Sequence, residues 1–204
     1  MSRLAARWFA WVQSSPAYRQ LHLEAVHHLP PGQGRSWLDV GCGPGLMTRL
    51  AADHGYQAHG IDHDPAMIDA ARRLSRTDSC RFTVGDLTQP LPQSDVVCAA
   101  SLLCQLPDPE AGLELLWEAV RPGGTLLIIE TAALMTPQRA RTATASRDRR
   151  SRQVLTAWAR ARQGRNLPAG LWANLPEASV SAVPLLDGCV QAVFIDRGHP
   201  SRLV

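Results

Sequence analysis

Three glycines stand within five residues in WLDVGCGPGLMTRL (residues 37–50), after an apolar run and before a run with helical periodicity. A glycine-rich turn in this setting joins a buried strand to a helix and directs the first amides of that helix toward a ligand. Such a turn can hold the pyrophosphate of a dinucleotide, the phosphates of ATP, or a ligand without phosphate. It therefore favours a fold in which strands lead directly into helices, and the rest of the sequence must identify the ligand.

The segments that follow continue this alternation. Strands are expected at 36–40, 57–61, 80–84, 95–100 and 125–130, and helices at 46–54, 65–74 and 109–120. Asp64 is the expected N-cap of the helix that begins at Pro65, and the turn Arg121–Gly124 is expected to end the last helix. Strands that alternate with helices of roughly 10–12 residues indicate βαβ units and a parallel sheet.

The last part of the chain has a different pattern. Two runs with β propensity, SVSAVPLL and CVQAVFID, are separated by Asp187-Gly188, which is a strong signal for a tight hairpin. The sequence therefore predicts a parallel α/β sheet that closes with an antiparallel pair of strands.

Two further segments are expected to be helical. Residues 3–28 show helical spacing that is interrupted at Ser14-Ser15-Pro16. Residues 137–164 are rich in arginine, and their expected apolar stripe consists of Val154, Leu155, Trp158 and Ala161. We find no internal repeat and expect one domain over residues 1–204. Its expected parts are an N-terminal helical cap (1–33), a ligand-binding core (34–130), an arginine-rich helical segment (131–170) and a β-hairpin (171–204).

Composition excludes several kinds of chemistry. All 21 basic residues are arginine, so a lysine Schiff base and a Walker A phosphate loop are both ruled out. The five cysteines and seven histidines are scattered without metal-ligand spacing, so we expect no metal. No run approaches the roughly 18–20 apolar residues of a membrane span, and the N-terminus does not resemble a signal peptide. A cytoplasmic location is therefore expected.

Two acidic residues narrow the choice of ligand. The turn reads G-x-G-x-G, with Leu46 where a dinucleotide site has its third glycine. Asp62 ends the second strand about 20 residues further on, where a carboxylate can accept hydrogen bonds from ribose hydroxyls. Asp86, in FTVGDL, follows the third strand, where a carboxylate can accept from an adenine amino group. Neither the dinucleotide fingerprint nor a phosphate loop requires this second acid.

With these residues, the chain resembles the class I S-adenosylmethionine (SAM) dependent methyltransferases, in particular the small-molecule group called methyltransferase type 11. The resemblance runs from about Gly34 to Glu130, roughly half of the chain. The segments that carry it are LDVGCGPG, GIDHDPAMI, VGDL, DVVCAASLLCQLPD and RPGGTLLIIE. The family implies a Rossmann-like α/β fold with a seven-stranded, mostly parallel sheet, helices on both faces and a C-terminal antiparallel hairpin.

The resemblance also implies which residues bind the cofactor. Asp39, Gly41, Gly43 and Gly45 would shape the pocket for the methionine end of SAM. Asp62 would bind the ribose hydroxyls, and the remaining expected contacts are His63 and Met67 near the adenine, Asp86 and Leu87 at its amino group and face, and Ser101 and Leu102 beside the amino acid moiety. The product would be S-adenosylhomocysteine (SAH).

The residues that act on the acceptor are less constrained. Many relatives carry a His-His pair where this chain has Cys104-Gln105, so a histidine base at that position is not available. Candidates in the leading segment, where the family builds its acceptor cap, are Tyr18, His22 and His28. Tyr18 and His22 are four residues apart and would share one helix face.

Several functional alternatives remain at this stage. The sequence lacks the Asn-Pro-Pro-Tyr type motif of nucleic-acid methyltransferases, which favours a small-molecule acceptor such as a metabolic or natural-product intermediate. An RNA methyltransferase that uses a basic helix over Arg139–Arg152, or a SAM-binding protein without catalysis, would also fit the cofactor motifs. A nicotinamide-dependent oxidoreductase is disfavoured by Leu46 and Asp86. The sequence does not indicate the oligomeric state.

Overall fold

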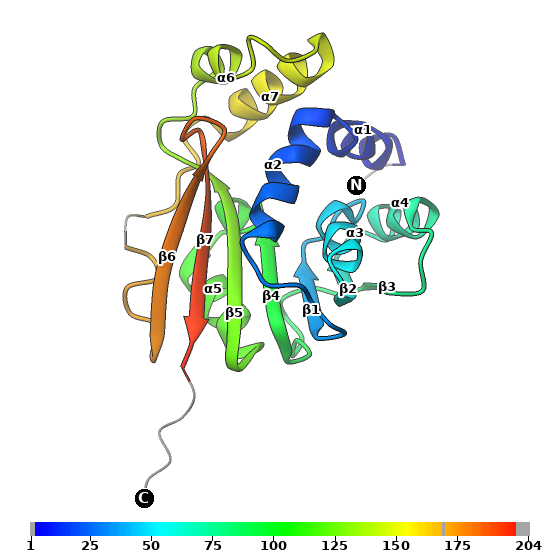
Figure 1. Ribbon diagram of the computed structural model, residues 1–204, viewed down its shortest axis with the longest axis vertical. Helices are drawn as coiled ribbons and strands as arrows, with labels where there is room; N and C mark the ends of the chain where they lie inside the picture. The colour runs from blue at the N-terminus through cyan, green and yellow to red at the C-terminus, as the bar shows by residue number, and fades with distance from the viewer. Residues whose placement is uncertain (1–2, 169, 199–204) are drawn as a thin grey trace, which may run out of the picture.

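The computed structural model describes residues 3–168 and 170–198. The strands are β1 (Ser36–Val40), β2 (Gln57–Asp62), β3 (Cys80–Val84), β4 (Ser94–Ala100), β5 (Val120–Thr131), β6 (Ala178–Leu185) and β7 (Val190–Arg197). The helices are α1 (Arg3–Gln13), α2 (Pro16–His27), α3 (Leu46–Asp53), α4 (Pro65–Leu74), α5 (Pro109–Glu118), α6 (Pro137–Ala143) and α7 (Arg149–Arg162), with a 3₁₀ turn, η1, at Leu103–Gln105. Figure 1 shows their arrangement.

The strands form one seven-stranded sheet in the order β3-β2-β1-β4-β5-β7-β6. Strands β1 to β5 pair in parallel, whereas β7 runs antiparallel to both β5 and β6. The hairpin turn has Asp187 and Gly188 at φ of 52° and 76°, and the Cys189 amide donates to the Leu186 carbonyl at 3.0 Å. Positive φ at both central residues matches the twist of an antiparallel pair. The predicted fold and its C-terminal hairpin are therefore confirmed.

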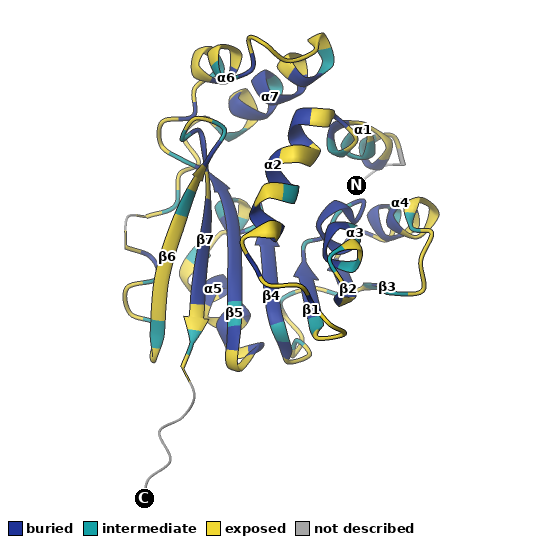
Figure 2. Cartoon of the chain, in the orientation of Figure 1, coloured by how far each residue is buried: buried dark blue, intermediate teal, exposed yellow. Residues whose placement is uncertain are grey.

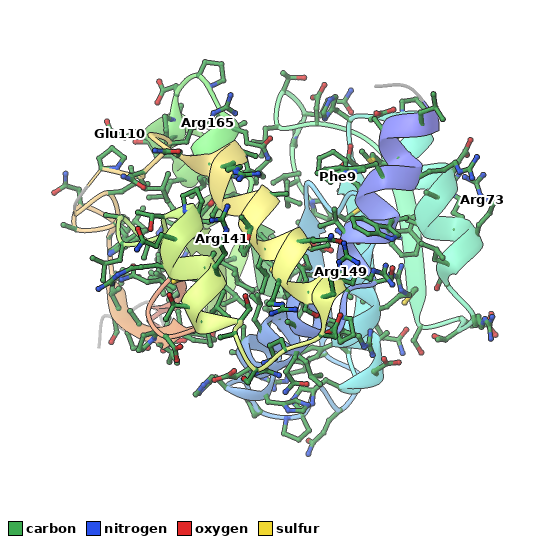
Figure 3. All side chains as sticks on the ribbon, turned by 90° about the horizontal axis from the view of Figure 1, so that it is seen from above. Phe9, Arg73, Glu110, Arg141, Arg149 and Arg165 are labelled. Carbon is green, nitrogen blue, oxygen red and sulfur yellow. The ribbon has the colours of Figure 1, made fainter. Side chains whose placement is uncertain are left out.

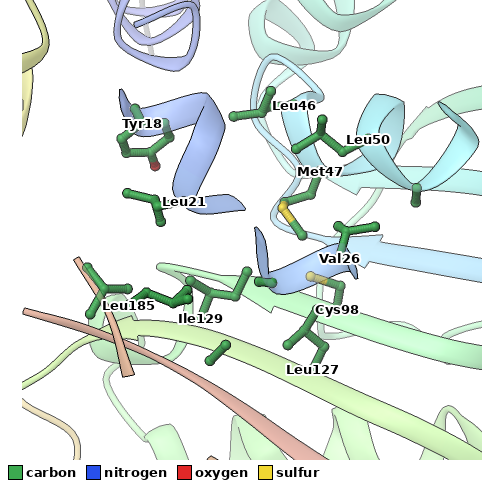
Figure 4. Close-up of a cluster of buried hydrophobic side chains, with 14 of the residues drawn as sticks. Tyr18, Leu21, Val26, Leu46, Met47, Leu50, Cys98, Leu127, Ile129 and Leu185 are labelled. Atoms are coloured by element: carbon green, nitrogen blue, oxygen red, sulfur yellow. The ribbon is translucent and has the colours of Figure 1, made fainter. Parts of the chain in front are cut away.

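Helices bury both faces of the sheet. Along β4, Val96 and Cys98 belong to the cluster under α2, α3 and α7, whereas Val97 and Ala99 face the cluster under α5. Apart from their lower ends, β4 and β5 are dark in Figure 2, as expected for parallel strands covered on both sides. Figure 4 shows the first cluster, in which side chains from α2 and α3 meet those of β4 and β5. The carboxyl ends of the parallel strands lie below α6, α7 and α1 (Figure 1).

One boundary differs from the sequence expectation. Helix α5 ends at Glu118 rather than Val120, and the segment Arg121–Gly124, expected as a turn, belongs to the start of β5. The register between β4 and β5 shifts between Ser94 and Val96, which accommodates the extra residues as an irregularity within the strand. A Cβ on Gly124 would lie 2.6 Å from the Asp95 carbonyl oxygen, so glycine allows the two strands to approach there.

The arginine-rich segment also differs in detail. Residues 139–152 do not form one basic helix, because α6 ends at Ala143 and α7 begins at Arg149. The Asp148 side chain accepts from the Ser151 amide at 3.0 Å and caps the second helix. The buried stripe of α7 includes Ala159 in place of Ala161, which is exposed. Ala159 is four residues after the buried Leu155 and shares its face, whereas Ala161 is about 120° away from Leu155 around the helix.

Part of the expected organisation lies outside the described residues. The cap (1–33), the segment 131–170 and the hairpin segment (171–204) each include undescribed positions, and so does the expected single domain. Within residues 3–168 and 170–198, no helix is long and apolar enough to cross a membrane.

Candidate functional site

The glycine turn, Gly41–Gly45, connects β1 to α3 at the carboxyl edge of the sheet. Its three glycines have φ of 71°, 53° and 80°, a left-handed conformation that costs other residues about 1–2 kcal/mol. At Gly45 the packing is equally restrictive, because a Cβ would lie 2.6 Å from the Phe82 ring of β3. The turn is thus fixed by backbone conformation and by contact with the neighbouring strand.

Asp39 supports this turn from below. It lies in β1 with 1% of its surface exposed, and one carboxylate oxygen accepts from the Thr48 amide at 3.0 Å and the Thr48 hydroxyl at 2.6 Å. Burial raises the pKa of Asp39 to about 6, although the hydrogen bonds from Thr48 oppose that rise. Asp39 therefore ties β1 to the first turn of α3 and acts on the glycine turn through that contact.

Asp62 joins the end of β2 to the same turn. Its carboxylate accepts from the Gly43 amide at 2.8 Å and from the Asp64 amide at 2.9 Å, and the residue is buried. An ionised carboxylate has about four acceptor positions, so these two bonds leave further capacity for a ligand hydroxyl. The neighbouring His63 ring is exposed, with Nδ1 at 3.6 Å from an Asp62 oxygen.

The end of β4 contributes Ser101 and Leu102. Ser101 has φ of 57°, and its amide donates to the Ile129 carbonyl at 2.8 Å. The Leu102 side chain lies against Gly41, where a Cβ would come within 2.9 Å of Cδ1. The structure thus brings the ends of β1, β2 and β4 to one place, which we call the glycine-turn edge.

Three of the other expected residues lie apart from these contacts. Met67 of α4 is buried in a cluster with Ala6 of α1. Asp86 is exposed, and its carboxylate accepts from the Thr88 amide at 2.9 Å and from the Thr88 hydroxyl. Leu87 is half-buried and packs toward the cluster under α5. The structure therefore places Asp86 on an exposed loop without a contact to Asp62 or to the glycine turn.

Gln13 is a residue of this edge that the sequence did not indicate. It is the last residue of α1, and its Oε1 accepts from the Leu46 amide, the first of α3, at 3.2 Å. Its Nε2 lies 3.6 Å from the Cβ position on Gly43. The N-terminus of a helix favours an acceptor oxygen, and here a neutral amide supplies it. Because 33 residues separate the two partners, no local pattern could reveal this contact.

Tyr18 and His22 lie together on α2, as their spacing predicts. Their ring centroids are 4.4 Å apart, and Tyr18 also contacts Trp158 of α7 at 5.1 Å. The His22 Nδ1 is 2.7 Å from the Tyr18 carbonyl oxygen, which fits a donated hydrogen bond from that nitrogen. Burial lowers the pKa of His22 to about 4 and raises that of Tyr18. His22 is thus neutral at pH 7, and His28, the third candidate, is exposed beyond the end of α2.

A buried acid completes this region. Glu130, near the end of β5, has 6% of its surface exposed, and one of its oxygens accepts from the Cys104 amide at 3.3 Å. The other oxygen has no hydrogen-bond partner among the described residues, nor has Nε of Arg162. Arg162 of α7 donates to the Ser101 carbonyl at 3.1 Å. We call Tyr18, His22, Cys104, Glu130 and Arg162 the inner cluster.

The ionisation of the inner cluster follows from its burial. Burial raises the pKa of Glu130, whereas hydrogen bonds from Cys104 and the charge of Arg162 oppose the rise. Burial and the nearby Glu130 raise the pKa of the Cys104 thiol to about 12, so this cysteine is not a thiolate at pH 7. Glu130 and Arg162 were not predicted as site residues. The one signal for Glu130 was an acid at the end of an otherwise apolar strand.

The described residues of this region do not form a cluster of metal ligands. Among residues 3–168 and 170–198, no group of three or more histidine, cysteine, aspartate or glutamate side chains is arranged to hold a metal ion.

Comparison with known proteins identifies the segment that builds the glycine-turn edge. Residues 38–128 match the family model described as "Methyltransferase domain", which includes the glycine turn, Asp62, Asp86 and the end of β4. The malonyl-[acyl-carrier protein] O-methyltransferase of Serratia marcescens is 36% identical over 103 residues, which cover 49% of this chain and 40% of that protein. The curated relatives that this chain matches are longer than the chain, and the aligned part spans 40–56% of their length.

Solved structures extend the likeness to the whole fold. A protein from Methanococcus maripaludis matches with a TM-score of 0.70 at 12% identity, covering 100% of this chain and 96% of that one. The magnesium protoporphyrin IX methyltransferase from Synechocystis PCC 6803, solved with bound SAH, matches with a TM-score of 0.60 at 15% identity. That match covers 89% of this chain and 84% of the other. At these identities the likeness concerns the fold alone.

Proposed function

Because residues 38–128 belong to the class I, type 11 methyltransferase family, we propose that this protein transfers a methyl group from SAM to a small-molecule acceptor and releases SAH. The observation that carries the proposal is the contact between family segments that are distant in sequence. Asp62 is bonded to Gly43, and Leu102 packs on Gly41, at the carboxyl edge of the sheet. Open α/β sheets bind their ligands at this edge.

The polar groups at the glycine-turn edge suit the chemistry of SAM. Asp62 has acceptor capacity for the ribose hydroxyls beyond its bonds to Gly43 and Asp64. Gly43 presents no side chain, and a Cβ there would already come within 3.6 Å of Gln13. We propose that Asp39 positions the turn, that Asp62 and His63 face the ribose and adenine, and that Asp86 and Leu87 contact the adenine after their loop moves inward.

The remaining cofactor contacts are proposed for the amino acid end. Ser101 and Leu102 would lie beside it, and the Leu46 amide, now bonded to Gln13, would be available to a carboxylate. Met67 would support the adenine side from beneath α1. When bound, SAM supplies a methyl carbon activated by a sulfonium, and the protein then has to orient the acceptor and exclude water.

The inner cluster is the proposed acceptor side. Tyr18 and Trp158 provide aromatic surface, and the unpartnered oxygen of Glu130 provides a hydrogen-bond acceptor. Buried polar atoms in native proteins are nearly always hydrogen-bonded, so an acceptor hydroxyl or amine is a suitable partner for Glu130. We propose that Glu130 holds this group and takes its proton. His22, neutral and bonded to the Tyr18 carbonyl, would orient Tyr18.

The helices that pack over the inner cluster bound the proposed acceptor side. A metabolic or natural-product intermediate with a hydroxyl, amine or thiol fits a site bounded by α2, α7 and the end of β5.

Calorimetric titration with SAH tests the cofactor assignment. Asp86→Ala should weaken SAH binding about tenfold, because one adenine hydrogen bond to a charged group is lost. Asp69→Ala removes an equally exposed acid from α4 and should leave SAH affinity unchanged. If the purified protein does not bind SAH, or binds NAD or ATP instead, the proposal is wrong.

Turnover separates an enzyme from a binding protein. A screen of small hydroxyl, amine and thiol acceptors, read as SAH formation, should yield at least one substrate. With that substrate, Glu130→Gln should lower kcat about a hundredfold, as for loss of a general base, with SAH affinity retained. Glu118→Gln, at the exposed end of α5, is the matched control. Equal turnover in the two variants would remove Glu130 from the acceptor side.

A further inference from the structure

A hollow lies on the outer surface of the molecule, between α6 and α7. It has a volume of about 570 Å³, and its lining includes Arg141, Ala145, Arg149, Arg152, Thr156 and Arg160. We call it the arginine groove. Figure 3 labels Arg141 and Arg149 on these two helices in the view onto the top of the molecule. The volume lies within the range of small-molecule sites, about 300–1,000 Å³.

The arginine groove is separate from the inner cluster. Helix α7 packs its inner face on α2 through Ser151, whose hydroxyl accepts from the Ala17 amide at 3.1 Å, and through Trp158. Arg162 also points inward, to the Ser101 carbonyl. Arg160, two residues earlier, is about 200° away around the helix and lines the groove. A helix about 10 Å in diameter therefore separates the two regions.

The four guanidiniums of the groove carry uncompensated charge. None of them has an ion pair or a side-chain hydrogen bond within the described part of the chain. The acid nearest in sequence, Asp148, is engaged by the Ser151 amide and hydroxyl at 3.0 and 2.6 Å. By contrast, Arg150 on the same helix bonds to the Trp11 carbonyl and lies over the Trp11 ring. The groove thus gathers arginines whose donors remain free.

The arrangement of these arginines suits closely spaced anionic groups. Arg152, Thr156 and Arg160 are four residues apart along α7 and form one row about 12 Å long. Guanidiniums bind phosphate oxygens in bidentate fashion, with five N–H donors each. Two phosphate monoesters carry about three to four negative charges at pH 7, which matches the four positive charges of the groove.

A single-stranded RNA is a poorer match. Sites for single strands combine a basic groove with aromatic side chains on which bases stack. The lining of the arginine groove contains no aromatic residue, and the helix expected to carry a continuous basic surface over 139–152 is interrupted between α6 and α7.

We propose that the arginine groove is a second ligand site, which binds a small molecule carrying two or more phosphate groups. The site is formed by α6, α7 and the turn between them, and it does not depend on the proposed methyl transfer. Its ligand contacts the guanidiniums of Arg141, Arg149, Arg152 and Arg160 on the outer side of α7.

Calorimetry with sodium tripolyphosphate tests this site on the full chain, with and without SAH. The wild type should bind tripolyphosphate saturably, and R152A/R160A should weaken binding about tenfold or more. R139A/R147A removes two exposed arginines of the same segment that do not line the groove, and it should bind as the wild type does. R152K/R160K keeps the charge without the bidentate fork and should show an intermediate loss.

Three results would overturn the proposal. The first is absence of saturable tripolyphosphate binding to the wild type. The second is an equal loss in R152A/R160A and R139A/R147A, which would indicate a diffuse charge effect. The third is tighter binding of a 12-nucleotide RNA than of tripolyphosphate at the same salt concentration, which would assign the surface to nucleic acid. If R152A/R160A fails to fold, the tripolyphosphate affinity of R152K/R160K tests the groove instead. SAH binding is measured separately and tests the methyl-transfer site.

Discussion

The buried acids of the glycine-turn edge and of the inner cluster differ in how far their capacity to accept hydrogen bonds is used within the protein. Asp39 and Asp62 each accept two hydrogen bonds of 3.0 Å or less. Glu130 keeps one carboxylate oxygen without a partner among the described residues. Unmet polar atoms are costly in a protein interior, and they persist where a ligand can meet them. The acids of the glycine-turn edge are thus bonded within the protein, whereas Glu130 of the inner cluster keeps an oxygen for the acceptor that we propose.

Asp39 of the glycine-turn edge and His22 of the inner cluster respond to pH in opposite ways. Burial raises the pKa of Asp39 to about 6, so its folded form binds a proton more readily than its unfolded form. Burial lowers the pKa of His22 to about 4, so its folded form binds a proton less readily. As pH falls from 6.5, protonation of unfolded His22 therefore favours unfolding, whereas protonation of Asp39 favours the folded state.

The largest expected effect comes from a substitution in the glycine turn of the glycine-turn edge. Gly45→Ala places a Cβ against the Phe82 ring in a residue at φ of 80°, and should lower the free energy of unfolding by about 3 kcal/mol or more. Gly34→Ala is the matched control, because Gly34 has φ of 82° and open space around it. It should cost about 1 kcal/mol. Urea unfolding measures both, and equal losses would show that the Phe82 contact does not restrict the turn.

The next largest effect concerns the inner cluster and is the pH dependence of stability caused by His22. Between pH 6.5 and 4, the buried His22 should remove up to about 3 kcal/mol of stability as pH falls, because its pKa moves from 6.5 to about 4 on folding. His22→Gln cannot titrate, so its urea-unfolding free energy should fall less between pH 7 and pH 5 than that of the wild type. Parallel pH profiles in the two proteins would mean that His22 is not buried as described.

The smallest effect concerns the position between the two regions. Ser101 has φ of 57° and a buried hydroxyl without a partner among the described residues, so Ser101→Gly should raise stability by about 1 kcal/mol. Glu177→Gly relieves a similar φ of 55° at an exposed residue away from the site. Both variants should stabilise the protein in urea, whereas only Ser101→Gly should change SAH affinity. If Glu177→Gly also changed SAH affinity, the change caused by Ser101→Gly could not be attributed to the end of β4.

Local sequence patterns determined much of the glycine-turn edge and the C-terminal hairpin. Glycines at Gly41, Gly43 and Gly45, the cap at Asp64 and the Asp187-Gly188 hairpin act within a few residues, so their conformations could be predicted from residue type alone. The parallel sheet followed from the alternation of strands and helices, whereas the order of its strands is seen only in the structure. The positions of Asp39 and Asp62 at strand ends followed from the sequence as well, because the carboxyl ends of parallel strands meet at one edge.

Only the tertiary structure decided the rest of the inner cluster and the position of Gln13. Glu130, Arg162 and Gln13 come from elements far apart in the chain, and burial rather than residue type sets the ionisation of Glu130 and His22. The same holds for the arginine groove. Asp148 caps α7, so the basic segment forms two helices, and arginines of both helices line the groove. Conformation at a turn is a local property, whereas burial and long-range contact depend on how the whole chain packs.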